Sequence, residues 1–143
     1  MMIESDLIIA HFKKSDWLKK YADAIFDAIR GGILKVEVST EIFHEVYYVL
    51  SEFTETSVII KNFSYLMGLD GIEFLSPTPE VYIAALSLKE QYQLSSIFDA
   101  IYAAQLLIQS KDKTIISTEH IYDKISGIKR IDPKDFCKMK GLL

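Results

Sequence analysis

The sequence contains a single cysteine, Cys137, and only two arginines, Arg30 and Arg130. One thiol allows neither an internal disulfide nor a cysteine-built zinc site, and a reducing cytoplasm is the expected compartment. No apolar run reaches the roughly 18 residues that a bilayer span requires. Acidic residues precede the short apolar run at the start of the chain, which is the wrong order for a secretory signal. We therefore expect no membrane association.

Positive charge is also scarce. The chain carries 16 lysines and arginines against 20 acidic residues, a formal net charge of −4. Such a field does not attract nucleic acid over long distances, so binding of a polyanion requires a local patch or a metal ion. The doublets Lys13–Lys14 and Lys19–Lys20 are the best local candidates. Their ordinary interpretation is a solvated face of an early helix.

The length of 143 residues, half of them hydrophobic, fits one domain over residues 1–143. Short segments rich in β-branched residues predict strands, and longer segments with helical spacing predict helices. The strands are expected within 1–3, 34–40, 71–76, 114–118 and 127–132, and the helices within 16–30, 40–53, 57–68, 79–92 and 95–110. This alternation predicts a three-layer α/β/α fold with a mainly parallel central sheet. The two consecutive helices before 114–118 predict a helical hairpin.

Ligands of open parallel sheets bind beyond the carboxyl ends of the strands. Six acidic residues either follow the predicted strands or begin the neighbouring helices: Glu4, Asp6, Glu45, Asp99, Glu119 and Asp123. Three connections and one helix start thus bring carboxylates toward one edge of the sheet. This placement predicts an acidic site there.

Each acid also has an ordinary explanation. Ser96 and Asp99 have the spacing of a capping box, in which the carboxylate accepts from the backbone N–H of the cap residue. Glu45 continues a polar stripe on its helix, and Glu119 suits the positive end of a helix dipole. The acids after the first strand fit caps or turns.

The surroundings of Asp99 favour a functional role. On a helical wheel its neighbours include Tyr102 and Leu106, whereas Gln105 and Gln109 lie on a different, more polar side. A buried carboxylate without a partner costs several kcal/mol or stays protonated. A hard divalent cation with oxygen ligands, Mg²⁺ or Mn²⁺, removes that penalty. The pattern therefore predicts that Asp99 holds a metal ion.

Four segments together resemble the motif blocks of PIN-domain proteins, and most closely the VapC-like toxins of toxin–antitoxin pairs. They are IESDLIIAHFK (3–13), STEIFHEVYYVL (39–50), SSIFDAIYAAQLL (95–107) and IISTEHIYDKISGIKRIDP (115–133). The resemblance implies a Mg²⁺- or Mn²⁺-dependent endoribonuclease. Single-stranded or looped RNA is the expected substrate, because such strands expose their backbone and bases. The resemblance also implies a homodimer and a small VapB-like antitoxin that covers the acidic edge.

The resemblance assigns roles residue by residue. Glu45 matches the second acid of the family pattern, as a water-holding group or general base, and Asp99 matches the third. Glu4 takes the position of the first Asp and Asp6 that of the following Asn, and either acid is a candidate first ligand. The two belong to the implied catalytic set, which is Glu4, Asp6, Glu45, Asp99 and Glu119.

The last block places Glu119 at the position of the family's final Asp, with Ser117 or Thr118 as the matching hydroxyl. Glu119 would support a second ion, and Asp123 would assist from the next turn. The implied metal ligands are Glu4, Asp6, Asp99, Glu119 and Asp123.

Glutamate replaces aspartate at the first and last positions, which adds a methylene where Mg²⁺ demands close octahedral geometry. The alternative function is therefore a weakened or inactive PIN-fold module that binds a partner. Receiver and dehalogenase-like folds also gather acids at strand ends, but the segment 71–76 lacks the aspartate that a receiver needs, and ESD is not D-x-D. The apolar segments 43–50 and 63–69 fit either the core or an interface.

Overall fold

The computed structural model describes residues 1–143 and contains one five-stranded sheet, in the order β3-β2-β1-β4-β5. The strands are β1 Met2–Ile3, β2 Val36–Ser39, β3 Ile72–Leu75, β4 Thr114–Ile116 and β5 Lys129–Ile131. All four strand pairs are parallel. Each strand lies within a segment that the sequence pattern predicts to be extended.

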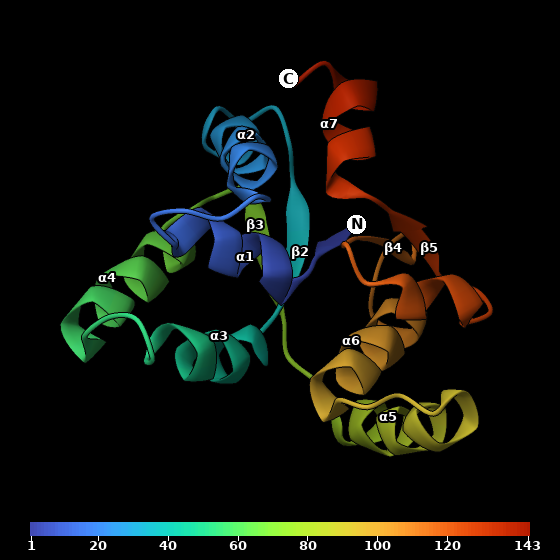
Figure 1. The fold of residues 1–143 in the computed structure, drawn as a ribbon. Helices are drawn as coiled ribbons and strands as arrows, with labels where there is room; N and C mark the ends of the chain where they lie inside the picture. The colour runs from blue at the N-terminus through green and yellow to red at the C-terminus, as the bar shows by residue number, and fades with distance from the viewer.

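Seven α-helices and one short 3₁₀ helix surround the sheet (Figure 1). They are α1 Ser5–Phe12, α2 Lys19–Arg30, α3 Ile42–Leu50, α4 Thr56–Met67, α5 Pro79–Tyr92, α6 Ile97–Ile108, η1 His120–Lys124 and α7 Pro133–Lys140. Helix α1 contacts α2 and α3, while α4 contacts α3 and α7 contacts α2. Helices α5 and α6 pair as the predicted hairpin. The three-layer α/β/α fold is confirmed.

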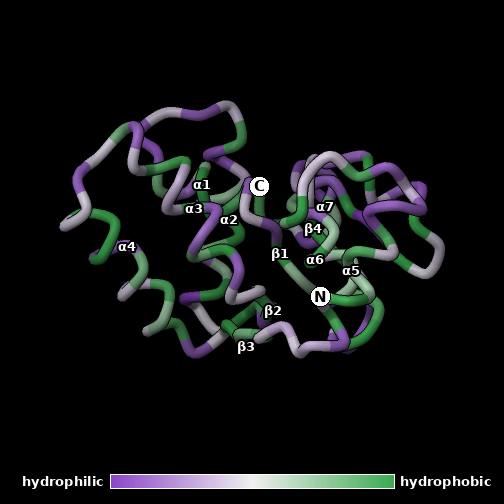
Figure 2. The backbone as a smooth tube through the Cα atoms, turned by 90° about the horizontal axis from the view of Figure 1, so that it is seen from below, coloured by the Kyte–Doolittle hydropathy of each residue, from purple (hydrophilic) through white to green (hydrophobic).

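The inner strands β1, β2 and β4 are buried along their whole length, whereas the edge strands β3 and β5 are partly exposed. Burial on both faces is typical of parallel sheets covered by helices. No helix of the structure is both long and apolar enough to cross a membrane. Figure 2 shows that α4 alternates between hydrophobic and hydrophilic residues along its length, as a helix at the border of the molecule does.

The direction of winding reverses between β1 and β4. The chain moves from β1 to β2 and β3 on one side, and then crosses to β4 and β5 on the other side of β1. Connections that leave neighbouring strands in opposite directions open a crevice at the carboxyl ends of these strands. The acidic residues after β1 and β4 therefore lie at the crevice of this sheet.

Two features differ from the sequence pattern. Helix α1 has no counterpart among the predicted helices, because it begins directly after a two-residue strand. Gln105, on the more polar side of its helix, is fully buried. Its Nε2 donates to the Leu75 carbonyl oxygen at 2.9 Å and to Gln109 Oε1 at 3.0 Å, and Gln109 donates to the Ser76 carbonyl oxygen at 2.8 Å. These amides attach α6 to the end of β3.

One acid, Glu37, is buried within β2, on the side of the molecule where the chain starts. Its carboxylate accepts from the Met1 ammonium at 2.9 Å, from Ser110 Oγ at 2.7 Å and from the Lys111 N–H at 3.1 Å. Burial acts to raise the pKa of Glu37, but these donors outweigh it and hold that pKa below its usual value. The buried charge is thus fully compensated.

Gly71 precedes β3 at a point where no side chain fits. A β-carbon there would lie 2.9 Å from Ile29 Cγ2 and 3.0 Å from the Leu34 carbonyl oxygen. We expect Gly71→Ala to lower the free energy of unfolding by about 1–3 kcal/mol, because the backbone must shift to relieve the overlap. Urea denaturation measures this loss.

Gly68→Ala is the matched control, since a β-carbon at Gly68 meets its nearest neighbours, the Ser64 and Tyr65 carbonyl oxygens, at 3.5 and 3.6 Å. This variant should be as stable as the wild type or slightly more stable. Equal stability of the Gly71 and Gly68 variants would contradict the close approach of the chain at Gly71.

Candidate active site at the carboxyl edge of the sheet

Glu4 lies at the end of β1 and is buried, with 4 % of its surface exposed. It is the residue before α1 and has an extended backbone, which ends the strand and starts the helix within one residue. Ser117 Oγ donates to Glu4 Oε2, and Tyr122 Oη donates to Glu4 Oε1 at 3.3 Å. Both carboxyl oxygens therefore have hydrogen-bond donors from the segment that follows β4.

Asp6 lies in the first turn of α1, where its charge is favoured by the helix dipole. Its Oδ2 accepts from the Thr118 N–H at 2.9 Å and from Thr118 Oγ1 at 2.7 Å. Its Oδ1 accepts from the Leu7 N–H at 2.7 Å. The sequence left open whether Ser117 or Thr118 is the matching hydroxyl. Both act as donors, Ser117 to Glu4 and Thr118 to Asp6.

Helices α3 and α6 each contribute one acid from their first turn, Glu45 and Asp99. Tyr102, one turn after Asp99, donates through Oη to Glu45 Oε1 at 2.9 Å and so joins the two helices. Ser96 caps α6 by accepting from the Phe98 N–H at 3.1 Å. No hydrogen bond joins the Asp99 carboxyl to the Ser96 N–H, so the capping box is not formed.

The pKa values link five of the acids into one electrostatic group. Burial, followed by the charge of Asp6, raises the pKa of Glu4 well above its usual value, and Asp99 and Glu45 add to the shift. Burial also raises the pKa of Asp99 to about 6, with Glu45 and Glu119 as the next causes. Asp6 has a raised pKa because of burial, with a contribution from Glu119. Glu45 and Glu119 thus act as charges on the other three acids, and the five carboxylates form one electrostatic group.

No cation compensates this group. None of the five acids forms an ion pair within 4.0 Å, whereas the buried Glu37 holds the Met1 ammonium. Like charges close together in a partly buried site either keep a proton or bind a cation. The pKa values of Glu4, Asp6 and Asp99 are accordingly raised, chiefly by burial and by the neighbouring carboxylates.

Asp123 is not part of this group. Its carboxylate pairs with Arg130, with Nε to Oδ1 at 2.9 Å, and with His120 Nδ1 at 2.9 Å, and it is exposed. The Arg130 and His120 contacts lower the pKa of Asp123, in contrast to the raised values at the candidate site. Arg130 also donates through Nη1 to the Ser117 carbonyl oxygen at 2.9 Å. Asp123 therefore holds Arg130 against the end of β4.

The donor set has the chemistry of a Mg²⁺ or Mn²⁺ site, since it consists of carboxylate oxygens with hydroxyls behind them. No three carboxylate, imidazole or thiol groups of the structure lie close enough to share an ion as they stand, so the predicted ligand set stays a prediction. Glu119 is exposed, unlike the buried Glu4. Small side-chain movements would have to accompany ion binding.

Two tyrosines belong to the site although the sequence analysis gave neither a role there. Tyr102 and Tyr122 are fully buried, and burial together with the nearby carboxylates raises the pKa of both phenols, which keeps them protonated as donors. Each follows an acid of the site by three residues, Asp99 and Glu119 respectively. On a helical turn that spacing places two side chains on one face, which is the signal that identifies them.

Comparison with known proteins agrees with this geometry. The PIN domain family model matches residues 1–128, so the chain belongs to the PIN-domain family. PIN domains are generally nucleases, and they usually use divalent metal ions. No curated protein matches the sequence. The matched region contains all five acids of the group and ends before β5 and α7.

The charge group makes a prediction for stability. The pKa of Asp99 is about 6 in the folded chain against an ordinary value of 3.8, so the folded state binds the proton more tightly than the unfolded chain. The free energy of unfolding therefore falls as pH rises through that window. In chelator at pH 7.5, Asp99→Asn should be more stable than the wild type by on the order of 1 kcal/mol, since solvent screens part of the shift.

Urea denaturation at pH 4 and pH 7.5 tests this expectation, and the difference should vanish at the lower pH. Asp123→Asn is the opposite case, because the pKa of Asp123 is lowered by Arg130. That variant should be less stable than the wild type at pH 7.5 and approach it as the pH falls. A wild type more stable than Asp99→Asn at pH 7.5 in chelator would contradict the mutual repulsion of the site acids.

Proposed function

We propose that this chain is a metal-dependent endoribonuclease that cleaves single-stranded or looped RNA, with Mg²⁺ or Mn²⁺ as cofactor. The observation that supports it most is the uncompensated group of five acids at the crevice between β1 and β4, in a chain of the PIN-domain family. A metal-dependent hydrolase that acts on phosphodiesters uses such oxygen ligands to hold its cation. RNA that is unpaired offers its backbone and bases to a shallow site.

In this proposal Glu4 or Asp6 would be a primary ligand together with Asp99, and Glu119 would support a second ion. A bound cation would neutralise charge on the scissile phosphate and lower the pKa of a water molecule. Glu45 accepts the proton of the attacking water, and its carboxylate is oriented for that task by the Tyr102 hydroxyl at 2.9 Å. Asp123 is left out of the ligand set, because its carboxylate pairs with Arg130.

The cleavage of labelled RNAs by the purified chain tests the proposal. A mixed panel of structured RNAs is incubated with Mg²⁺, with Mn²⁺ or with chelator. We expect cutting in unpaired regions only when metal is present. Asp99→Asn should reduce the rate by about 100-fold or more, because the lost carboxylate contributes several kcal/mol of charge stabilisation.

Glu90→Gln is the matched control, since Glu90 is an exposed acid of α5 and lies outside the acid group. It removes the same charge and should cut at the wild-type rate. Cutting that persists in chelator or in the Asp99 variant would point to a contaminating nuclease and contradict the proposal.

A second candidate is an inactive PIN-fold module that binds a partner. The observation in its favour is the state of Glu4, whose two carboxyl oxygens already accept from Ser117 and Tyr122. A carboxylate held in this way is less free to coordinate an ion. The absence of cutting with either metal, from a chain free of any copurified inhibitor, would favour this module.

We further infer that the chain is a cytoplasmic toxin that forms a homodimer and is neutralised by a VapB-like antitoxin. Support for the dimer comes from apolar side chains of α5 and α3 that remain in solvent, among them Ile83 (69 % exposed), Leu86 (61 %) and Tyr48 (65 %). Tyr82 Oη donates to Glu41 Oε1 at 2.6 Å and so joins α5 to the start of α3. Exposed apolar side chains are typical of interfaces when they form a contiguous patch.

Light scattering of the purified chain measures the oligomeric state. We expect a dimer for the wild type and a folded monomer for Ile83→Lys combined with Leu86→Lys, because two charges cannot be buried unpaired in an apolar interface. A monomeric wild type at micromolar concentration would contradict the dimer.

A further inference from the structure

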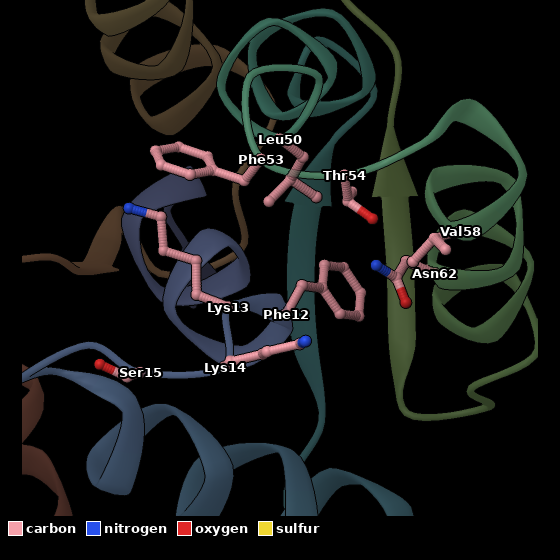
Figure 3. A pocket seen from close by; sticks show the side chains of 9 residues that line it. All are labelled: Phe12, Lys13, Lys14, Ser15, Leu50, Phe53, Thr54, Val58 and Asn62. Atoms are coloured by element: carbon pink, nitrogen blue, oxygen red, sulfur yellow. The ribbon is translucent and has the colours of Figure 1, made fainter.

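A pocket of about 430 Å³ lies at the far end of α1 from the acids. Helix α1 begins beside Glu4 and ends at Phe12, and α3 carries Glu45 in its first turn and ends at Leu50. Phe12 and Leu50 both line the pocket, which α4 closes on a third side (Figure 3). Because α1 and α3 are in contact, the two helices run together from the acid group to the pocket.

The pocket is cationic in an acidic chain. Residues 13–20 contain four lysines against a single aspartate, Asp16. The doublet Lys13–Lys14 lines the pocket and lies in the connection after α1, so its ordinary interpretation as part of a helix face is wrong. Lys14 is exposed and forms no ion pair, and Lys13 Nζ is no nearer to Asp16 than 4.0 Å. Lys14 thus brings an unpaired ammonium group to the pocket, and Lys13 brings one that pairs with Asp16 at 4.0 Å and lies over the Phe53 ring.

An aromatic ring and neutral polar groups complete the lining. Phe53 is 66 % exposed, and Lys13 Nζ lies 4.8 Å from the centre of its ring. Figure 3 shows Lys13 extending beside Phe53, with Thr54 and Asn62 across the pocket. An exposed aromatic face stacks a base of any type, a nearby ammonium binds its phosphate, and an amide and a hydroxyl bind base edges.

We infer that this pocket is a subsite for one nucleotide of the RNA strand whose backbone is cut at the acid group. The inference rests on the proposed function and adds to it a site that holds the substrate away from the chemistry. Lys13 lies seven residues after Asp6 along α1, which is about 10 Å of helix. That length is within reach of a single strand that extends from the acid group.

An acidic peptide is the competing occupant, since lysines and apolar side chains suit it as well. Three features favour RNA. Phe53 is 66 % exposed with the Lys13 ammonium over its ring, the polar groups Thr54 and Asn62 are uncharged, and Trp17, which is 71 % exposed, follows in the same connection outside the pocket lining. Aromatic side chains interleaved with lysines are typical of surfaces that bind single strands.

Fluorescence anisotropy with a labelled, unstructured 12-nucleotide RNA of mixed sequence tests the subsite, in chelator so that no cutting occurs. Lys13→Ala combined with Lys14→Ala should weaken binding about tenfold at 50 mM salt and lower the salt dependence by roughly the share of two phosphates. Phe53→Ala should weaken binding about fivefold or more without changing the salt dependence.

The matched control is Lys138→Ala combined with Lys140→Ala, which removes the same charge from the exposed end of α7. It should bind RNA as the wild type does. Equal losses in the two double variants, or unchanged binding in the Lys13–Lys14 variant, would overturn the subsite. The subsite would also be overturned if the wild type bound a labelled Glu-Leu peptide more tightly than the RNA and the Lys13–Lys14 variant did not bind the peptide.

RNA binding in chelator tests the subsite, and RNA cutting with metal tests the nuclease, so the two proposals can fail independently. RNA that binds through Lys13, Lys14 and Phe53 but is never cut would support the subsite and contradict the nuclease. The Lys13–Lys14 variant could instead bind and cut RNA as the wild type does, with cutting lost on Asp99→Asn. That result would support the nuclease and overturn the subsite.

Discussion

The hydrogen bonds between the end of β4 and the end of β1 are the constraint on which the candidate site depends. Strand β1 contains only two residues, so the ladder alone holds it weakly. Ser117 and Thr118 donate to Glu4 and Asp6 across the crevice, and they fix where the chain turns from strand into α1. The direction of α1, and with it the positions of α3 and of the pocket, follows from that turn.

The same molecule treats two buried acids in opposite ways. Glu37 is surrounded by donors that include an ammonium, and its pKa is lowered. Glu4 is surrounded by hydroxyls and by other acids, and its pKa is raised. Neutral donors satisfy the oxygens of a carboxylate but do not compensate its charge. The ammonium beside Glu37 compensates its charge, whereas the group of five acids has no cation beside it, which is the contrast on which the proposed metal dependence rests.

Much of the fold could be predicted from the sequence because its signals are local. Short β-branched segments mark β2 and β4, and helical spacing marks the α5–α6 hairpin. The gathering of Asp99 and Glu45 with Glu4 also follows from parallel topology, since strand ends and the helices beside them meet at one edge. Helix α1 could not be predicted in this way. The strand before it has only two residues, so the sequence shows no change from strand spacing to helical spacing.

The long-range partners could not be predicted. Asp123 pairs with Arg130 seven residues later in the chain, and nothing in the spacing shows that this contact competes with a role beside Glu119. Gln105 is buried because its amide meets the backbone at the end of β3, a contact across 30 residues. Such contacts depend on tertiary packing, whereas periodicity reports only which side of a helix is polar.

Helix α1 is short and rigid, and this has a consequence for where an RNA would be cut. A helix of eight residues does not stretch, so the acids at its start and the lysines after its end stay at a constant separation. With a base seated at one end, the phosphate presented at the other would always lie the same number of nucleotides away. The helix would then work as a ruler, and cleavage would be registered to a base at a distance from the broken bond.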